Sequence, residues 1–372
     1  MYGDCYECKN KNLDPPTTND SSFYYQWVSE KEDRPGKQGK IFHVTVTLKK
    51  KITYNILDLI QEFNSKIPTF LKHYYDTSHQ HRTLRNLEDN LKDNEVKIIM
   101  DFSENYICKY SEEIQSVHFG ASKTQLSLHT GVFCFKKSQE KKCVSFTTVS
   151  ECLRHDAPAI WAHLKPILSL IKSFVPKLDV IHFQSDGPST QYKNKTNFDL
   201  FNYHCEKLQL ESATWNFTTP GHGKSSADGT GGTLKGLCDR AVSAGTDVTS
   251  AVDFINVVSN SKKIKVFHII EQDIKAVDSL VRPGMKPAPQ SNKIFQIIFS
   301  QKHKDILFLN SLSCSDPWCL QNPPCNHFSL PCTRWYLKSG KRNVQMDSKV
   351  STKKQRLNVQ DGVPRTSSRK RR

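Results

Sequence analysis

Residues 96–101 read VKIIMD and residues 179–187 read DVIHFQSDG, two short apolar runs that each lead to an aspartate. Uninterrupted apolar runs of this length are typical of central strands that are buried on both faces of a sheet. Adjacent central strands would bring Asp101 and Asp186 side by side at one edge of that sheet. Like charges at such a separation strongly disfavour joint ionisation unless a cation is bound.

The segments around these two runs predict further strands and helices. Residues 124–137 and 143–149 are rich in Thr, Val and Phe, which indicates two strands, paired antiparallel. A helix capped by Asp156 precedes the second apolar run, and a helix, a strand over 212–220 and a helix over 233–245 follow it. Three strands followed by alternating helices and strands is the order of an RNase H-like α/β domain. Its mixed sheet is covered by helices on both faces.

The whole chain is predicted to have four regions. They are an α+β N-terminal region (1–95), the RNase H-like domain (96–250), a small α+β appendage that contains cysteines (251–333) and a disordered basic tail (334–372). In the first region, residues 40–50 alternate like a strand, and apolar residues then recur at helical spacing from Ile56. Pro68 is expected to break or kink that helix. The polar residues 79–95 then lead to the second region.

The positive charge is concentrated at one end of the chain. The formal net charge is +16, and residues 338–372 carry twelve Lys/Arg and two Asp/Glu. This segment has too few apolar residues to fold alone, so we expect a disordered arm that binds nucleic acid or directs nuclear import. A tail that only confers solubility is the alternative. The basic cluster at the end of residues 338–372 consists of Arg369, Lys370, Arg371 and Arg372.

Composition also excludes some classes of protein. No stretch of about eighteen apolar residues occurs, so no membrane span is expected. The first residues lack the apolar core of a signal peptide. Twelve cysteines without such a signal predict reduced thiols or metal ligands and not a disulfide framework.

The glycine-rich stretch PGHGKSSADGTGGTLKG, residues 220–236, contains a Gly-Lys-Ser but is not a nucleotide-binding P-loop. That motif needs a glycine where this chain has Thr218. Asp228 within the stretch is instead the candidate for a third acid, with Asp239 as the alternative. The glycines near Asp228 would let a phosphate chain approach the backbone closely. His222 and Lys224 are candidates for contacting the phosphate or donating a proton.

Three carboxylates at one sheet edge are suited to metal-dependent phosphoryl chemistry. A pair of Mg²⁺ (or Mn²⁺) ions held by Asp101, Asp186 and Asp228 would relieve the repulsion between them. Such ions activate an attacking hydroxyl and stabilise the leaving oxygen of a phosphodiester. Glu104 and Gln191 are candidates for groups that orient the metal ligands. Ordinary strand-end turns are the alternative explanation for Asp101 and Asp186.

Three motifs in this order, DFSENY (101–106), SDGPSTQYKN (185–194) and the stretch at 220–236, resemble a group of transposon-derived animal proteins. These proteins are similar to DDE-type transposases, which have an RNase H-like catalytic core. The resemblance spans about residues 96–245 and implies metal-dependent cleavage and transfer of DNA strands. The motif positions that match are Asp101, Glu104, Asn105, Tyr106, Asp186, Gly187, Gln191, Tyr192, Lys193, Asn194, His222, Gly223, Lys224, Asp228, Gly229, Gly231 and Gly232.

A second group of potential ligands lies near the end of the chain. Cys314, Cys319, Cys325 and Cys332, with His327 among them, fall within nineteen residues and are candidates for a structural Zn²⁺ site. The spacing departs from common zinc modules, and free or buried thiols are the alternative. A weaker candidate is the pair Cys5 and Cys8. That pair would need a histidine brought near in space, for which the candidates are His73, His79 and His81.

Together these observations favour a nuclear, Mg²⁺-dependent, transposase-like enzyme that acts on DNA, assembles as a homo-oligomer on it and has no membrane association. The rival interpretation is a catalytically inactive, host-adopted or decayed relic that binds DNA or protein. A hydrolase of RNA within hybrids is a third class with the same fold and acids.

Overall fold

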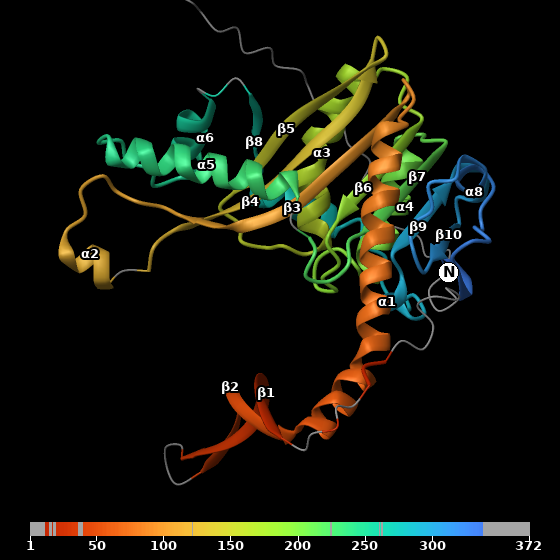
Figure 1. Cartoon of the computed structure of the whole chain (residues 1–372). Coiled ribbons are helices and arrows are strands. Elements are labelled where there is room, and N and C mark those ends of the chain that lie inside the picture. The colour runs from red at the N-terminus through yellow and green to blue at the C-terminus, as the bar shows by residue number, and fades with distance from the viewer. Residues whose placement is uncertain are drawn as a thin grey trace, which may run out of the picture.

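The computed structural model describes residues 12–14, 17, 20–35, 40–120, 122–223, 225–259, 261 and 263–337. Within them the protein is a mixed α/β structure built on one large sheet flanked by helices (Figure 1). The sheet has nine strands in the order β11-β10-β9-β7-β6-β3-β4-β5-β8. The expectation of a mixed sheet flanked by helices is therefore confirmed.

The centre of the sheet contains the strands predicted from the apolar runs. β3 pairs parallel with β6, β6 pairs parallel with β7, and β3 pairs antiparallel with β4, which in turn pairs antiparallel with β5. Their bounds are β3 (Glu95–Ile107), β4 (Gln125–Lys137), β5 (Glu140–Ser150), β6 (Val180–Ser185) and β7 (Ser212–Phe217). A short helix, α2 (Gln115–Gly120), lies in the connection from β3 to β4 and extends away from the sheet (Figure 1).

Helices cover the two faces of the sheet and bury two apolar clusters. On one face α3 (Ala157–Phe174) and α4 (Lys195–Lys207) bury the larger cluster, which includes Trp161, Phe183 and Trp215. On the other face α5 (Ser226–Ser243) and α6 (Ala251–Ser259) bury a smaller one around Leu128 and Phe254. Asp156 caps α3 as predicted, since its side chain accepts a hydrogen bond from the amide of Ala159.

The segment expected as a separate appendage adds strands to both edges of the same sheet. β8 pairs parallel with β5 at one edge, and β9 to β11 continue antiparallel from β7 at the other. The elements are β8 (Ile264–His268), α7 (Glu271–Asp278), β9 (Gln296–Ser300), β10 (Ile306–Asn310), α8 (Pro317–Gln321) and β11 (Ser329–Tyr336). The division into domains stays a prediction, but the sheet continues across the expected boundary at residue 250. The basic tail beyond residue 337 lies outside the described residues.

The N-terminal region is a hairpin followed by one long helix. β1 (Ser21–Pro35) and β2 (Ile41–Asn55) pair antiparallel, and the hairpin stands apart from the large sheet at the far end of α1 (Ile56–Asp89) (Figure 1). α1 continues through Pro68 and through the polar residues after His79, so the helix does not break at the proline. Its last turns remain helical since Leu84 and Leu87 are buried against the main body.

Two further observations bear on the composition. Cys134 and Cys143, which face each other across β4 and β5, are joined in a disulfide, contrary to the expectation of reduced thiols. Among the residues that the structure describes, no helix combines the length and the apolar character needed to cross a bilayer.

Candidate functional site

Asp101 and Asp186 occupy matching positions on two parallel strands. The ladder between β3 and β6 ends at Ile99 and Gln184, and each aspartate follows two residues later on its own chain segment. Both side chains are partly buried. The register therefore places the two carboxylates at the same edge of the sheet, as the apolar runs predicted.

The electrostatics of the edge show that three acids act on one another. Burial raises the pKa of Asp101 to about 7, with further contributions from the charges of Asp186 and then Asp228. Burial also raises the pKa of Asp186 to about 6, and the charge of Asp228 adds to it. Desolvation and like charge both favour the protonated forms. Asp186 also has a buried carboxylate oxygen, Oδ1, with no hydrogen-bond partner.

Asp228 enters this group from the first turn of α5. It is the N3 residue of a capping box, in which its carboxylate accepts a hydrogen bond of 2.7 Å from the amide of Ser225. Its side chain is exposed. Asp239, the alternative third acid, lies further along α5 and forms an exposed ion pair of 2.7 Å with Lys109. The structure thus groups Asp228, and not Asp239, with Asp101 and Asp186.

Thr130 on β4 contacts both β3 and α5. Thr130 faces Asp101 in the antiparallel ladder, and its hydroxyl donates to the carbonyl of Ala227, the residue before Asp228, at 3.0 Å. The same hydroxyl lies 3.4 Å from the carbonyl of Asp101. Thr130 therefore fixes the start of α5 relative to β3.

A glycine of the 220–236 stretch lets α5 approach β3. A Cβ atom added at Gly231 would lie 2.1 Å from Oγ and 3.1 Å from Cβ of Ser103, so Ser103 would have to shift, whereas Gly229 and Gly232 have open space there. We expected the glycines to admit a phosphate chain. For Gly231, the structure instead indicates close packing of a helix on a strand.

The turn after β6 is held from the neighbouring strand. Trp215 on β7 donates its indole N–H to Oγ of Ser185 at 2.9 Å, and that hydroxyl donates to the carbonyl of Asp186 at 2.8 Å. Gly223 packs on the same aspartate, since a Cβ there would lie 3.3 Å from Cβ of Asp186. The loop that follows β7 therefore lies against Asp186.

The long helix α1 supplies residues that the sequence did not reveal as part of this region. His73 and His222 place their Nε2 atoms 3.1 Å apart, and the hydroxyls of Thr77 and Thr219 lie 2.8 Å apart. Thus α1 runs over the loop that contacts Asp186. His222 is exposed, and Lys224 lies outside the described residues.

Lys193 is a buried cation next to the acidic edge. Burial lowers its pKa to about 8, and its ammonium lies over the rings of Phe295 at 4.3 Å and Phe217 at 5.0 Å. A Cβ added at Gly187, next to Asp186, would come within 3.5 Å of Nζ of Lys193. Lys193 belongs to the SDGPSTQYKN motif, but only the fold shows that its charge is buried.

The two predicted orienting residues have other contacts. Glu104 is almost fully exposed, with its carboxylate 3.8 Å from the ammonium of Lys235. Gln191 lies in the turn before α4, where its carbonyl accepts a hydrogen bond of 2.8 Å from the side chain of Asn194, the helix cap. A role for either in orienting metal ligands stays a prediction.

Potential metal-ligand atoms come closest together at places other than the acidic edge. In the part of the chain that the structure describes, two groups of three or more have all their atoms within 4.8 Å of one another. One consists of Cys314, Cys319, Cys325 and His327, and the other of Glu88 with the disulfide-bonded Cys134 and Cys143. The three acids are not drawn together to that distance. Cys332 lies apart on β11, where its thiol donates to the carbonyl of Arg334 at 3.2 Å.

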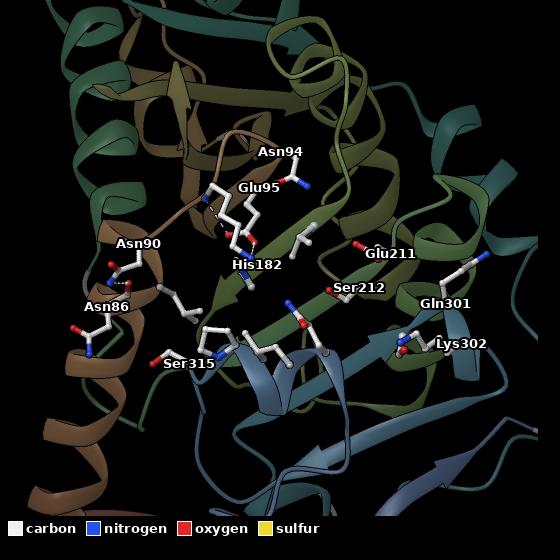
Figure 2. A pocket seen from close by; sticks show the side chains of 17 residues that line it. Asn86, Asn90, Asn94, Glu95, His182, Glu211, Ser212, Gln301, Lys302 and Ser315 are labelled. Carbon is white, nitrogen blue, oxygen red and sulfur yellow. Dashed lines mark hydrogen bonds and ion pairs between the residues drawn. The ribbon is translucent and has the colours of Figure 1, made fainter. Parts of the chain in front are cut away.

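A pocket of about 500 Å³ lies at the opposite ends of the central strands (Figure 2). Glu95, Val180 and Ser212, which begin β3, β6 and β7, line it, together with His182. Burial lowers the pKa of His182 to about 4. Asp101 lies further along β3, which continues past it to Ile107, and Asp186 directly follows the last residue of β6. This pocket is therefore separate from the acids.

The fold and site define a mixed α/β protein with three interacting carboxylates at one sheet edge. The chain belongs to a family described as a domain of unknown function (DUF8701), whose model matches residues 80–308. That range includes all three acids and ends before the cysteine cluster. No curated protein and no solved structure matches the chain.

Proposed function

We propose that this protein is a metal-dependent, transposase-like enzyme that cleaves and transfers DNA strands. The observation that carries the proposal is the grouping of Asp101, Asp186 and Asp228 at one sheet edge, where burial and mutual repulsion raise the pKa of the first two. Carboxylates with strongly raised pKa values at such an edge indicate a candidate functional site.

The proposed RNase H-like fold rests on strand order and direction. The central strands run β5-β4-β3-β6-β7, with β4 antiparallel to its neighbours and β3, β6 and β7 parallel. Helices cover both faces of these strands. This arrangement agrees with the order of elements predicted from the sequence, in which the first acid lies on the first strand and the second follows the fourth.

The residues at the edge fit divalent metal ions. Their donors are carboxylate oxygens, which Mg²⁺ and Mn²⁺ prefer. The buried, unpartnered Oδ1 of Asp186 is a ligand atom that a cation would satisfy. Bound there, Mg²⁺ supplies an activated hydroxyl and stabilises the leaving oxygen of a phosphodiester.

The protein's own groups would position the DNA backbone. Lys193, buried beside Gly187, would place a positive charge near the phosphate without exposing it to water. His222, held by His73 of α1, is the candidate proton donor to the departing oxygen. Lys224 keeps the role proposed for it in contacting the phosphate. The resulting order is attack of water on a DNA strand, followed by attack of the freed 3′-hydroxyl on target DNA.

The remaining parts of the proposal concern partners and location. Arg369, Lys370, Arg371 and Arg372 of the basic tail would add salt-dependent affinity for DNA and direct the protein to the nucleus. Assembly as a homo-oligomer on DNA belongs to the same proposal. These statements rest on the charge of the sequence and on the resemblance.

One observation favours a second candidate, a non-catalytic relic that binds DNA or protein. The carboxylate of Asp228 already caps α5, and the three acids do not approach within 4.8 Å of one another. A catalytic site would need Asp228 to leave the cap and turn toward the strand ends.

The deciding experiment is a calorimetric titration of the purified full chain with Mn²⁺, beside Asp186→Asn. The enzyme proposal predicts binding that the substitution abolishes, followed by Mn²⁺-dependent nicking of supercoiled plasmid by the wild type alone. Equal binding by both proteins, or no binding by the wild type with DNA present, would favour the relic. Asp239→Asn is the matched control, because it removes an acid of the same chain that pairs with Lys109.

A further inference from the structure

Three cysteines and a histidine converge in the loop between β10 and β11. The Sγ atoms of Cys314, Cys319 and Cys325 lie 3.6, 3.4 and 3.9 Å from Nδ1 of His327. In a tetrahedral zinc site, Zn–S bonds of ~2.3 Å and Zn–N bonds of ~2.0–2.1 Å separate sulfur from nitrogen by roughly 3.6 Å. The three distances lie around that value, and all four ligand atoms are mutually within 4.8 Å.

The three cysteines of the cluster are buried, His327 is exposed, and the backbone is fixed from outside. Cys314, Cys319 and Cys325 are each less than a tenth exposed and none of them forms a disulfide. Cys314 exchanges two hydrogen bonds of 3.0 Å with the side chain of Gln296 on β9. The carboxylate of Asp316 caps α8, which carries Cys319. Three thiols held together in this way, beside an imidazole nitrogen, form a ready set of soft ligands.

We propose that Cys314, Cys319, Cys325 and His327 bind one structural Zn²⁺ through three thiolates and Nδ1. This set replaces the predicted one, in which Cys332 was the fourth ligand. Four protein ligands close the coordination shell, so the ion has a structural and not a catalytic role. The site is separate from the acidic edge and independent of the function proposed for it.

The contacts of the neighbouring residues indicate what the ion stabilises. Ser313, next to Cys314, accepts a hydrogen bond of 2.7 Å from His79 through its carbonyl and donates one of 2.7 Å from its amide to Gln80. Gln80 in turn donates to the carbonyl of Phe217, at the end of β7. The ring of Phe328 lies 4.5 Å from that of His79. The zinc-bound loop therefore anchors the middle of α1 to the sheet.

The first test measures metal in the full-length protein after reduction, addition of excess Zn²⁺ and removal of the unbound ion. We expect about one zinc per chain in the wild type and in Cys332→Ser. We expect His327→Ala to bind more weakly by over ~100-fold, since even the loss of an outer-shell partner costs ~10–100-fold. His327→Cys should restore binding. A wild type without zinc, or a Cys332→Ser protein that loses it while His327→Ala keeps it, would overturn the proposal.

The second test replaces zinc with Co²⁺, which reports on the ligands by absorption. Tetrahedral thiolate coordination gives intense visible and sulfur charge-transfer bands, and His327→Cys should strengthen the latter. Asp186→Asn should leave these bands unchanged, which distinguishes this site from the acidic edge. The weak spectrum of octahedral, oxygen-bound Co²⁺ in the wild type would contradict the assignment.

The third test addresses the anchoring of α1. We expect removal of zinc to speed amide hydrogen exchange in residues 79–87 by at least ~10-fold, because these amides lie in the part of α1 that Ser313 and Phe328 hold. Residues 160–171 of α3, a helix that packs on the other face, serve as the internal control. Equal exchange with and without zinc would refute the anchoring role.

Discussion

Replacing Asp101 with asparagine should stabilise the metal-free protein while removing the acidic site. The pKa of Asp101 is raised from 3.8 to about 7, first by burial and then by the charges of Asp186 and Asp228. Since each pKa unit is worth about 1.36 kcal/mol, ionisation of this group destabilises the fold by ~4 kcal/mol at most. Water at the partly buried carboxylate reduces this figure, so we expect a gain of ~1–3 kcal/mol in the free energy of unfolding near pH ~8.

The pH dependence follows from the same shift. Because the pKa of Asp101 is higher in the folded state than in the unfolded chain, the folded protein keeps a proton that the unfolded chain has lost between pH ~4 and ~7. The stability contributed by this group therefore rises as the pH falls through ~7 toward ~4. Asp101→Asn should flatten that rise and leave the smaller part due to Asp186, whose pKa is about 6.

The assay is urea unfolding of the wild type and Asp101→Asn at several pH values. The buffer should lack Mg²⁺ and Mn²⁺ but contain no chelator, so that thiolate-bound zinc stays in place. Addition of Mn²⁺ to ten times its dissociation constant should stabilise the wild type by ~1.4 kcal/mol and the variant much less. Asp239→Asn, which loses an exposed ion pair, should change stability by less than ~1 kcal/mol. Destabilisation of Asp101→Asn beyond this control, or an unchanged pH profile, would refute the reasoning.

Four further substitutions test the packing around the site and in the larger core cluster. Gly231→Ala should destabilise the protein by ~1–3 kcal/mol in urea unfolding, because the new methyl meets Oγ of Ser103, whereas Gly229→Ala in open space should stabilise it by ~0.5–1 kcal/mol. Equal effects of the two would exclude the close contact. Lys193→Met should raise stability at neutral pH by up to ~3 kcal/mol, since burial lowers the lysine pKa to about 8, and should also reduce plasmid nicking. A loss of stability would mean that the ammonium has favourable partners. Trp161→Ala should cost ~3–5 kcal/mol by thermal or urea unfolding, because the indole is fully buried and bonded to Asn197. A cost below ~1 kcal/mol would mean that the cluster on the α3 face does not support the fold.

The central strands could be predicted because their signal is local. The runs that became β3 and β6 are largely buried on both faces, and an aspartate comes after each run, Asp101 within β3 and Asp186 directly after β6. Capping by Asp156 was equally readable, since it depends on a few neighbouring residues. These features need no knowledge of what the segments contact.

Features that depend on distant partners could not be predicted. The polar residues after His79 remain helical because Leu84 and Leu87 are buried. The helical spacing of these two leucines is hard to recognise in the sequence because charged residues surround them. His73 joins His222 across a long separation in sequence. The fourth member of the cysteine cluster is His327, because the loop after α8 places its Nδ1 beside the three thiols. Sequence spacing alone does not distinguish it from Cys332.

Asp228 connects the stability of the fold with the proposed chemistry, because its single carboxylate has two uses. As the N3 residue of the capping box it accepts a hydrogen bond from the amide of Ser225, and the loss of one such bond costs ~0.5–1.5 kcal/mol. Burial, followed by the charges of Asp186 and Asp228, destabilises the ionised form of Asp101 by up to ~4 kcal/mol. A bound cation would relieve part of this, which can offset the cost of uncapping. Binding should then release the amide of Ser225 at the start of α5, while Thr130 still holds the carbonyl of Ala227 and Gly231 holds the next turn against β3. Mn²⁺ should therefore speed amide hydrogen exchange at residues 225–228 and leave it unchanged at residues 231–238. That result would show that Asp228 has left the cap for the metal. Slower amide exchange in the first turn would mean that the cap persists. Any bound metal would then use only Asp101 and Asp186.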